Sequence, residues 1–189
     1  MVPVGNGSNS SSVGKGIRLM HEKEMAFEQP RIIGVQSAAA NPLAIAWEAV
    51  RQNSNSVTVD NWKQAYKPIN VGETTATAAR IGNPVSYKKV MREIVASNGS
   101  VLTAKEDELN EAVLVAGSDG HFVCPQTGTA LAGLRQAVSR GFVTKGERVV
   151  VVSTATGLKF SHIPVQFGKN LVTKASTCET EEVADIIGI

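Results

Sequence analysis

Small polar residues and glycines gather in one loop near the start of the chain. Residues 5–12 read GNGSNSSS and lie between a short apolar run and a helical pattern. Glycines let successive backbone N–H groups turn toward one point, and the N-terminus of a following helix adds positive potential there. The segment predicts a phosphate-binding loop, with an ordinary flexible turn as the alternative. It matches neither the dinucleotide fingerprint, which needs a third glycine, nor the Gly-Lys-Ser/Thr of a P-loop.

Three further segments carry small or hydroxylated residues that would let a flat ligand approach the backbone. Residues 153–159 (STATGLK) follow an apolar run, and a hydroxyl beyond the carboxyl end of a strand can hydrogen-bond a ligand nitrogen. Residues 73–84 (ETTATAARIGNP) and 124–134 (CPQTGTALAGL) are rich in Ala, Thr and Gly. Each segment also has a structural interpretation: a strand-ending turn, a tightly packed helix, and a helix packed against a sheet, respectively.

The usual catalytic constellations are missing from the pattern. His21, His121 and His162 are scattered without ligand spacing, and two cysteines without a histidine cluster do not make a zinc site, so no metal is expected. Cys124 and Cys178 are more typical of reduced thiols than of a disulfide. There is no G-x-S-x-G elbow, and Cys124 has no identifiable partner, which disfavours a hydrolase with its own triad.

Length and composition set the class of molecule. The chain has 189 residues, of which 42% are hydrophobic and 19% charged, enough for one ordinary domain or a large piece of a bigger one. A net charge of +2 gives no electrostatic argument for a nucleic-acid partner. No run of about 18 apolar residues predicts a membrane span, and no secretory signal is visible. The expected compartment is the cytoplasm, or a plastid if the chain belongs to a plant-like protein.

Strand and helix patterns alternate along the chain, which predicts an α/β fold with a mostly parallel sheet flanked by helices. Strands are expected at residues 1–4, 31–37, 100–103 and 147–153, with a short extended piece at 121–124. Helices are expected at about 11–25, 41–52, 74–81, 86–98, 103–118 (opened by a T-x-x-E capping box), 126–140 and 177–187. Residues 53–70 are expected to be irregular.

Taken together, the segments resemble the threonine synthase family, whose members are pyridoxal-phosphate enzymes of fold type II. Residues 3–9 (PVGNGSN) are similar to the family's phosphate-binding loop, usually PVGNAGN or PGGNLGN, and residues 74–84 to its run ending in RIGNP. Similar segments at 36–43 (QSAAANPL), 124–134 and 149–160, the last with a T-x-x-GLK ending, follow in the family's order. The resemblance implies that residues 1–160 are the C-terminal part of the large domain, and residues 161–189 a C-terminal tail.

The resemblance also implies roles for individual residues around the cofactor, pyridoxal 5′-phosphate. The residues at the family's phosphate loop are Val4, Gly5, Asn6, Gly7 and Ser8. Asn6 would also lie near the phosphate of the substrate, and Thr154 would hydrogen-bond the pyridine nitrogen. Ser8 stands where the family commonly has glycine, so a positive φ at this position would strain the backbone.

The reaction implied by the resemblance is the conversion of O-phospho-L-homoserine and water to L-threonine and phosphate, by a lyase that is a homo-oligomer when intact. The family's Schiff-base lysine lies upstream of the phosphate loop in a motif resembling F-K-D, and none of the eleven lysines here has that context. No catalytic residue is therefore assigned, and the chain alone is expected to be inactive. The alternatives are another fold-type II enzyme, such as threonine dehydratase or cysteate synthase, or a non-catalytic fragment that binds the cofactor or a partner carrying the missing N-terminal half.

Overall fold

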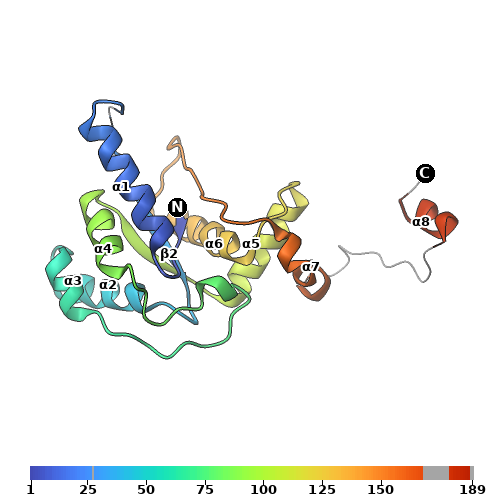
Figure 1. Ribbon diagram of the computed structural model, residues 1–189, viewed down its shortest axis with the longest axis horizontal. Coiled ribbons are helices and arrows are strands. Elements are labelled where there is room, and N and C mark those ends of the chain that lie inside the picture. Colours follow the sequence, from blue (N-terminus) through green and yellow to red (C-terminus); the bar gives the residue numbers. More distant parts are fainter. Residues whose placement is uncertain (27, 168–178, 188–189) are drawn as a thin grey trace.

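Three parallel strands form the centre of the molecule, and the computed structural model describes residues 1–26, 28–167 and 179–187. The strands are β1 (Val2–Pro3), β2 (Ile33–Ser37) and β3 (Ser100–Ala104), in the order β1-β2-β3. Val2 is paired with Gly34, and Val35 with Leu102. Helices flank the strands in Figure 1. The expected α/β class with a parallel sheet is therefore confirmed.

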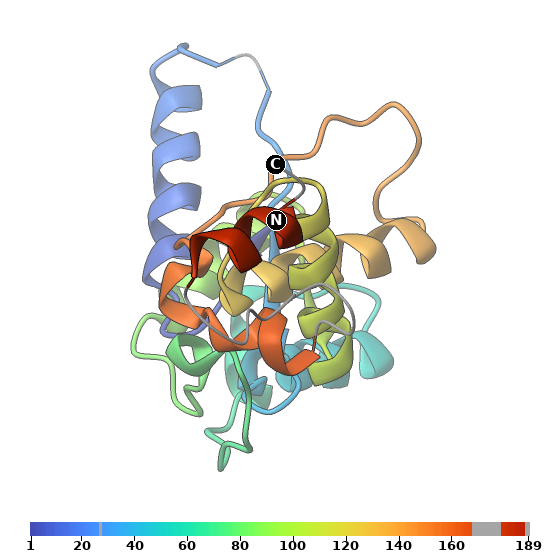
Figure 2. The ribbon, with the colours of Figure 1, turned by 90° about the vertical axis from the view of Figure 1, so that its right-hand side faces the viewer.

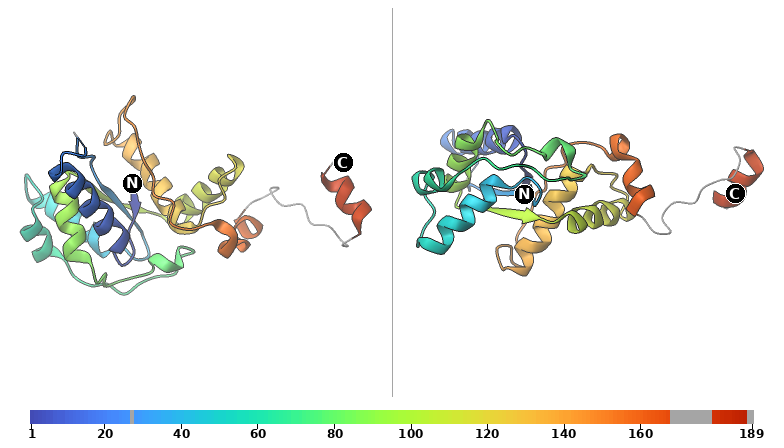
Figure 3. Two further views of the ribbon diagram at one scale, coloured as in Figure 1. Left: turned by 45° about the horizontal axis from the view of Figure 1, so that its top comes forward. Right: turned by 90° about the horizontal axis from the view of Figure 1, so that it is seen from below.

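Apart from the last two helices of the chain, the helices fall into two groups, one on each side of the strands (Figure 3). They are α1 (Ser8–Glu22), α2 (Pro42–Asn53), α3 (Val59–Ala65), α4 (Tyr87–Ala96), α5 (Glu106–Ser118), α6 (Pro125–Ser139), α7 (His162–Phe167) and α8 (Thr180–Ile187), with the 3-10 turns η1 (Thr77–Ala79) and η2 (Gly157–Phe160). Figure 3 shows α1 and α4 on one side of the strands and α5 and α6 on the other. Figure 2 shows α1 and the C-terminal end of α6 at opposite sides. Within the described ranges, no helix is long and apolar enough to cross a membrane.

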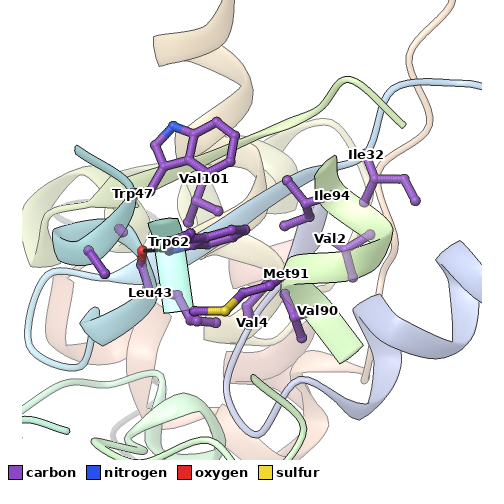
Figure 4. Close-up of a cluster of buried hydrophobic side chains, with 12 residues drawn as sticks. Val2, Val4, Ile32, Leu43, Trp47, Trp62, Val90, Met91, Ile94 and Val101 are labelled. Carbon is purple, nitrogen blue, oxygen red and sulfur yellow. Dashed lines mark hydrogen bonds between the residues drawn. The ribbon is translucent and has the colours of Figure 1, made fainter. Parts of the chain in front are cut away.

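One core lies between the sheet and the helices α2, α3 and α4. Because side chains alternate along a strand, Val2 and Val101 face this core while their strand neighbours face the opposite side. Trp62 is fully buried in it and donates its indole N–H to the Leu43 carbonyl at 3.0 Å. Its ring meets Trp47 edge-on with 4.8 Å between centroids (Figure 4).

The other core lies between the sheet and the helices α5 and α6. Ile33, Val35 and Leu102 face it from the strands. Helix α6 approaches β2 so closely that a Cβ added at Gly133 would lie 2.4 Å from a methyl carbon of Val35. The small residues of segment 124–134 therefore include one whose size is set by helix–sheet packing, as the structural interpretation of that segment expected.

The apolar run at residues 147–153 is not a strand covered on both faces, and that prediction was wrong. The Met1 amino group donates to the Val150 carbonyl at 2.8 Å, and the Val152 N–H donates to the Met1 carbonyl at 3.0 Å. These two hydrogen bonds follow the pattern of a parallel β-ladder, but on the side of β1 both are made by one residue, Met1. The run therefore lies beside the edge of β1 without forming a strand of its own, and Val150 is 71% exposed.

The helix expected from Thr74 is also wrong, because local hydrogen bonds hold this segment in another conformation. The Thr74 hydroxyl accepts the N–H of Ala76 at 3.1 Å, and both the N–H and the hydroxyl of Thr75 donate to Glu106 Oε1. Only η1 is helical here, as a single turn. Thr side chains that bond the nearby backbone compete with helix formation, and this outweighs the helix propensity of the alanines.

Helix α3 lies in a region expected to be irregular. It begins with a reciprocal cap in which Thr58 Oγ1 accepts the N–H of Asn61 and Asn61 Oδ1 accepts the N–H of Thr58. Asparagine at the third helical position replaces the Glu or Gln of the usual capping box, so the signal was missed. The capping box expected at 103–106 does not form. Instead, α5 begins at Glu106, and the Lys105 N–H donates to Glu108 Oε2 at 2.8 Å.

Most of the remaining elements lie close to their expected positions, but α7 and η2 form where no helix was expected. Helix α1 begins at Ser8, earlier than expected, and the extended piece at 121–124 contributes one antiparallel bridge, between Val123 and Thr156. Helix α8 falls in the expected terminal helix. Residues 168–178, 188 and 189 of the expected tail lie outside the described residues.

Candidate cofactor-binding site

A cavity of about 340 Å³ lies at the N-terminus of α1, beyond the carboxyl end of β1. Its lining residues come from four separate parts of the chain: Pro3, Gly5, Asn6, Gly7, Ser8, Asn9, Ala78, Ala79, Gln126, Thr154, Ala155, Lys159 and Phe160. Each of the four segments singled out for chemistry contributes at least one of them. Because parallel strands end at one edge of a sheet, segments far apart in sequence meet there.

The glycine-rich loop leaves the first turn of α1 open toward a ligand. Gly7 is the N-cap, with φ at 87°, and no side chain caps the helix. The helical hydrogen bonds begin with the Ser11 N–H donating to the Gly7 carbonyl at 3.0 Å, so the N–H groups before Ser11 have no acceptor within the helix. The first turn also contains no acidic residue. The positive φ falls at Gly7 and not at Ser8, which is helical, so the serine is not strained.

Two contacts hold the loop in place. A Cβ added at Gly5 would lie 2.9 Å from the Cα of Ala79, so the loop and the η1 segment touch through their backbones. Asn6 accepts the Val85 N–H on Oδ1 at 2.8 Å and the Ser86 N–H on its carbonyl at 3.1 Å, which ties the loop to the start of α4.

Val4 is the one predicted cofactor residue that does not line the cavity. Its side chain is 1% exposed and packs in the core with α4, and its N–H donates to the Val35 carbonyl at 2.8 Å. It continues the hydrogen bonding of β1 and so sets the direction in which Gly5 leaves the sheet.

Thr154 is held against the N-terminus of α6. Its N–H donates to Thr127 Oγ1 at 3.1 Å, and its hydroxyl oxygen lies 3.4 Å from the sulfur of Cys124. The same sulfur lies 3.3 Å from Thr127 Oγ1. Burial raises the pKa of the Cys124 thiol, but hydrogen bonds from these two threonines and from the backbone of Thr127 and Ala155 outweigh burial, so the pKa is lowered. The thiol is fully buried, as expected for a packed cysteine.

The lining of the cavity favours an anion. It contains no carboxylate, and its one ionisable residue is Lys159. Backbone N–H groups at a helix N-terminus, amide side chains and hydroxyls supply hydrogen-bond donors. These donors fit a phosphate group, and the volume lies in the range of sites for small ligands. Lys15 is exposed on α1 and lies outside the lining. The described residues contain no cluster of His, Cys, Asp and Glu that could hold a metal.

Sequence reasoning missed Gln126 as a residue of the site. It is the second residue of α6, 7% exposed, and it lines the cavity. The strand-to-helix turn at 124–126 was a signal, because such turns lie at the carboxyl edge of a sheet. The composition of segment 124–134 directed attention to packing instead.

The fold and the cavity define a class of protein: a parallel α/β protein with a cavity rich in hydrogen-bond donors at the carboxyl edge of its strands, where a helix begins. Within that class, the chain belongs to the pyridoxal-phosphate dependent enzyme family, whose model matches residues 1–155. Members of this family depend on pyridoxal phosphate.

Curated relatives include threonine synthases from plants, archaea and bacteria. The chain is 35% identical over 172 residues to chloroplastic threonine synthase 2 of Arabidopsis thaliana, which covers 90% of this chain and 31% of that protein. It is 34% identical over 160 residues to threonine synthase of Methanocaldococcus jannaschii, covering 84% of this chain and 36% of the relative. It is 32% identical over 187 residues to that of Bacillus sp. (strain ULM1), covering 98% and 47%. The chain thus spans about a third to a half of the length of these relatives.

A solved structure is similar in fold. The crystal structure of threonine deaminase from T.th. matches with a TM-score of 0.50 and 19% sequence identity, covering 74% of this chain and 43% of that one. The likeness supports the fold-type II architecture and nothing finer, because the identity is low.

Proposed function

We propose that this chain supplies the phosphate-binding end of a pyridoxal-phosphate site in a threonine synthase-like lyase, which converts O-phospho-L-homoserine and water to L-threonine and phosphate. The observation that carries the proposal is the convergence of the Gly5–Ser8 loop with Thr154 at one cavity. We further propose that residues 1–160 form the C-terminal part of a large domain whose remainder carries the Schiff-base lysine.

Three parts of the cavity have distinct tasks in this proposal: the first turn of α1, Thr154 and Asn6. The N–H groups of the first turn of α1 would bind the cofactor phosphate, since they have no acceptor within the helix. The Thr154 hydroxyl would hydrogen-bond the ring nitrogen, and Cys124 and Thr127 hold that residue in place. Asn6 would face the substrate phosphate through its amide nitrogen, because its amide oxygen already accepts the Val85 N–H. When bound, pyridoxal phosphate supplies an electron sink, which a neutral hydroxyl at the ring nitrogen tunes.

Two alternatives are separated by different observations. Another fold-type II activity, such as that of threonine dehydratase or cysteate synthase, would be indicated by turnover of a substrate without phosphate. A non-catalytic binding fragment would be indicated by the gene: a stop codon and a promoter directly upstream of Met1. An open frame encoding an F-K-D-like lysine there would favour the enzyme.

The first experiment uses the full chain and pyridoxal phosphate. The absorbance spectrum is recorded during a titration, the mixture is reduced with borohydride, and labelled lysines are mapped by mass spectrometry. We expect saturable binding without one specifically labelled lysine, and no turnover of O-phospho-L-homoserine by the chain alone. A single specifically labelled lysine would contradict the assignment of the Schiff-base residue to a missing segment, and absence of binding would contradict the cofactor site itself.

A charge substitution tests where the phosphate binds. Asn9→Asp adds a negative charge to the first turn of α1 at the cavity, so it should stabilise the free helix slightly and weaken phosphate binding. The matched control is Asn55→Asp, which makes the same charge change at an exposed position outside the cavity lining. Equal affinities for the two variants would show that the phosphate does not bind at α1.

A further inference from the structure

Gln126 carries a buried side-chain amide nitrogen whose hydrogen-bonding capacity is unused within the described residues. The residue is 7% exposed, and its Nε2 has no hydrogen-bond partner in the part of the chain that the structure describes. A buried donor without an acceptor is unfavourable, so such groups are rare in folded proteins and call for an explanation. Here the side chain lines the cavity at the N-terminus of α1.

The two other unpartnered buried atoms differ from it. Glu106 Oε2 belongs to a carboxylate whose other oxygen accepts both donors of Thr75. Gln136 Oε1 belongs to an amide whose nitrogen donates to the Thr103 carbonyl at 2.8 Å and to Glu108 at 2.9 Å. Both side chains are therefore fixed by contacts within the protein, whereas no hydrogen bond within the described residues holds the Gln126 amide nitrogen.

We propose that Gln126 is a ligand-binding residue of this cavity, whose side-chain amide donates a hydrogen bond to an anionic oxygen of the group bound there. The charge of the lining supports an anionic acceptor, because no carboxylate faces the cavity and Lys159 does. Helix α6 supports it as well: Gln126 lies in the first turn, where the helix dipole favours negative charge. The inference rests on the proposed function, since pyridoxal phosphate is the anion expected in the cavity.

Contacts of neighbouring residues fix the backbone from which the Gln126 side chain extends. Its neighbour Cys124 is fully buried and contacts Thr127 and Thr154, so the start of α6 is anchored to the segment that carries Thr154. Pro125 at the first helical position restricts the backbone further. Gln126, at the next position, thus lines the cavity from an anchored turn.

The test compares Gln126→Met with Gln136→Met in the full chain, with pyridoxal phosphate as the probe. Each substitution replaces an amide by an apolar side chain of similar length. Gln126→Met should weaken cofactor binding by about 10- to 100-fold, the effect of losing one hydrogen bond to a charged acceptor, and leave the denaturation midpoint of the free chain unchanged or higher. Gln136→Met should lower that midpoint and leave the dissociation constant unchanged, because it removes two internal hydrogen bonds far from the ligand.

A third variant separates the hydrogen bond from the shape of the side chain. Gln126→Glu keeps the shape but replaces the donor by a negative charge, so binding should weaken at least as much as in Gln126→Met. Unaltered binding in both Gln126 variants, with saturable binding by the parent chain, would overturn this inference and leave the proposed function standing. Absence of binding by the parent chain would overturn both. A lower midpoint of free Gln126→Met with unchanged affinity would assign the residue a structural role and also overturn the inference.

Discussion

Gly7 combines two constraints that can be measured separately. Its φ of 87° lies in the left-handed region, and a Cβ added to it would lie 2.5 Å from Cγ2 of Val90. The first constraint costs about 1–2 kcal/mol for a residue with a side chain. The second requires Val90, which is fully buried, to move, and overpacking of this kind costs about 1–3 kcal/mol. Gly7→Ala should therefore lower the free energy of unfolding by about 2–5 kcal/mol.

The assay is urea unfolding followed by tryptophan fluorescence, since Trp47 and Trp62 are both buried in the core that contains Val90. The matched control is Gly16→Ala in the same helix, where an added Cβ meets nothing within 4 Å. Alanine is favoured over glycine inside a helix, so this variant should be more stable by about 0.5–1 kcal/mol.

A double-mutant cycle with Val90→Ala divides the effect of Gly7→Ala into its two parts. Removal of the Val90 methyl groups relieves the steric contact but not the unfavourable φ, so the double variant should be more stable than the sum of the single effects by about 1–3 kcal/mol. The reasoning fails if Gly7→Ala costs less than about 1 kcal/mol, or if the two substitutions are additive.

Three further predictions concern the core, the surface and the buried thiol. Trp62→Phe should destabilise the chain by about 1–3 kcal/mol in the same urea assay, and more than Trp47→Phe, because Trp62 donates a buried hydrogen bond to Leu43. The backbone N–H of Thr144 and the Arg31 guanidinium hold the pKa of Glu147 below its usual value. This carboxylate therefore stabilises the fold above its unfolded pKa, and the contribution is lost as pH falls through the folded pKa. Glu147→Gln should reduce the loss of stability on acidification, and an unchanged pH profile would contradict this. Cys124 should react with iodoacetamide far more slowly in the native chain than in urea despite its lowered pKa, because it is fully buried; rapid native labelling mapped to this residue by mass spectrometry would contradict the packing.

Local patterns predicted the elements whose signals did not compete with tertiary contacts. The β-branched run around Ile33 is a buried strand, and Pro42 opens the helix that its fixed φ favours. The prediction of a helix after Thr74 failed because the threonine hydroxyls and backbone of this segment bond Glu106 and one another. Sequence periodicity does not reveal a hydrogen-bond partner that lies on a distant helix. The prediction of a strand near Val150 failed because the hydrogen bonds of this run with the neighbouring segment involve Met1 alone.

The candidate site likewise has a part that local patterns predicted and a part that they did not. The loop around Gly7 was predictable because glycine content and the start of a helix are local properties, and the observed φ falls on a glycine rather than on Ser8. Thr154 was placed by resemblance, and its position in the structure follows from bonds to Thr127 that no local pattern contains.

The turn at 124–126 was a sequence signal for the place of Gln126 at the edge of the sheet, but residue type could not show that its amide nitrogen lacks an internal partner. Gln126 and Gln136 lie on the same helix, and residue type does not distinguish them, yet one amide nitrogen has two acceptors and the other has none in the described parts of the chain. Folded proteins pair nearly all of their buried polar groups. A buried donor without an acceptor beside a cavity is therefore the place where we expect a ligand to complete the hydrogen bonding. The same reasoning applies to the first turn of α1, whose N–H groups lack both a side-chain cap and an internal acceptor. Gln126 and the first turn of α1 line one cavity, so the single anionic ligand that we propose would account for both sets of donors.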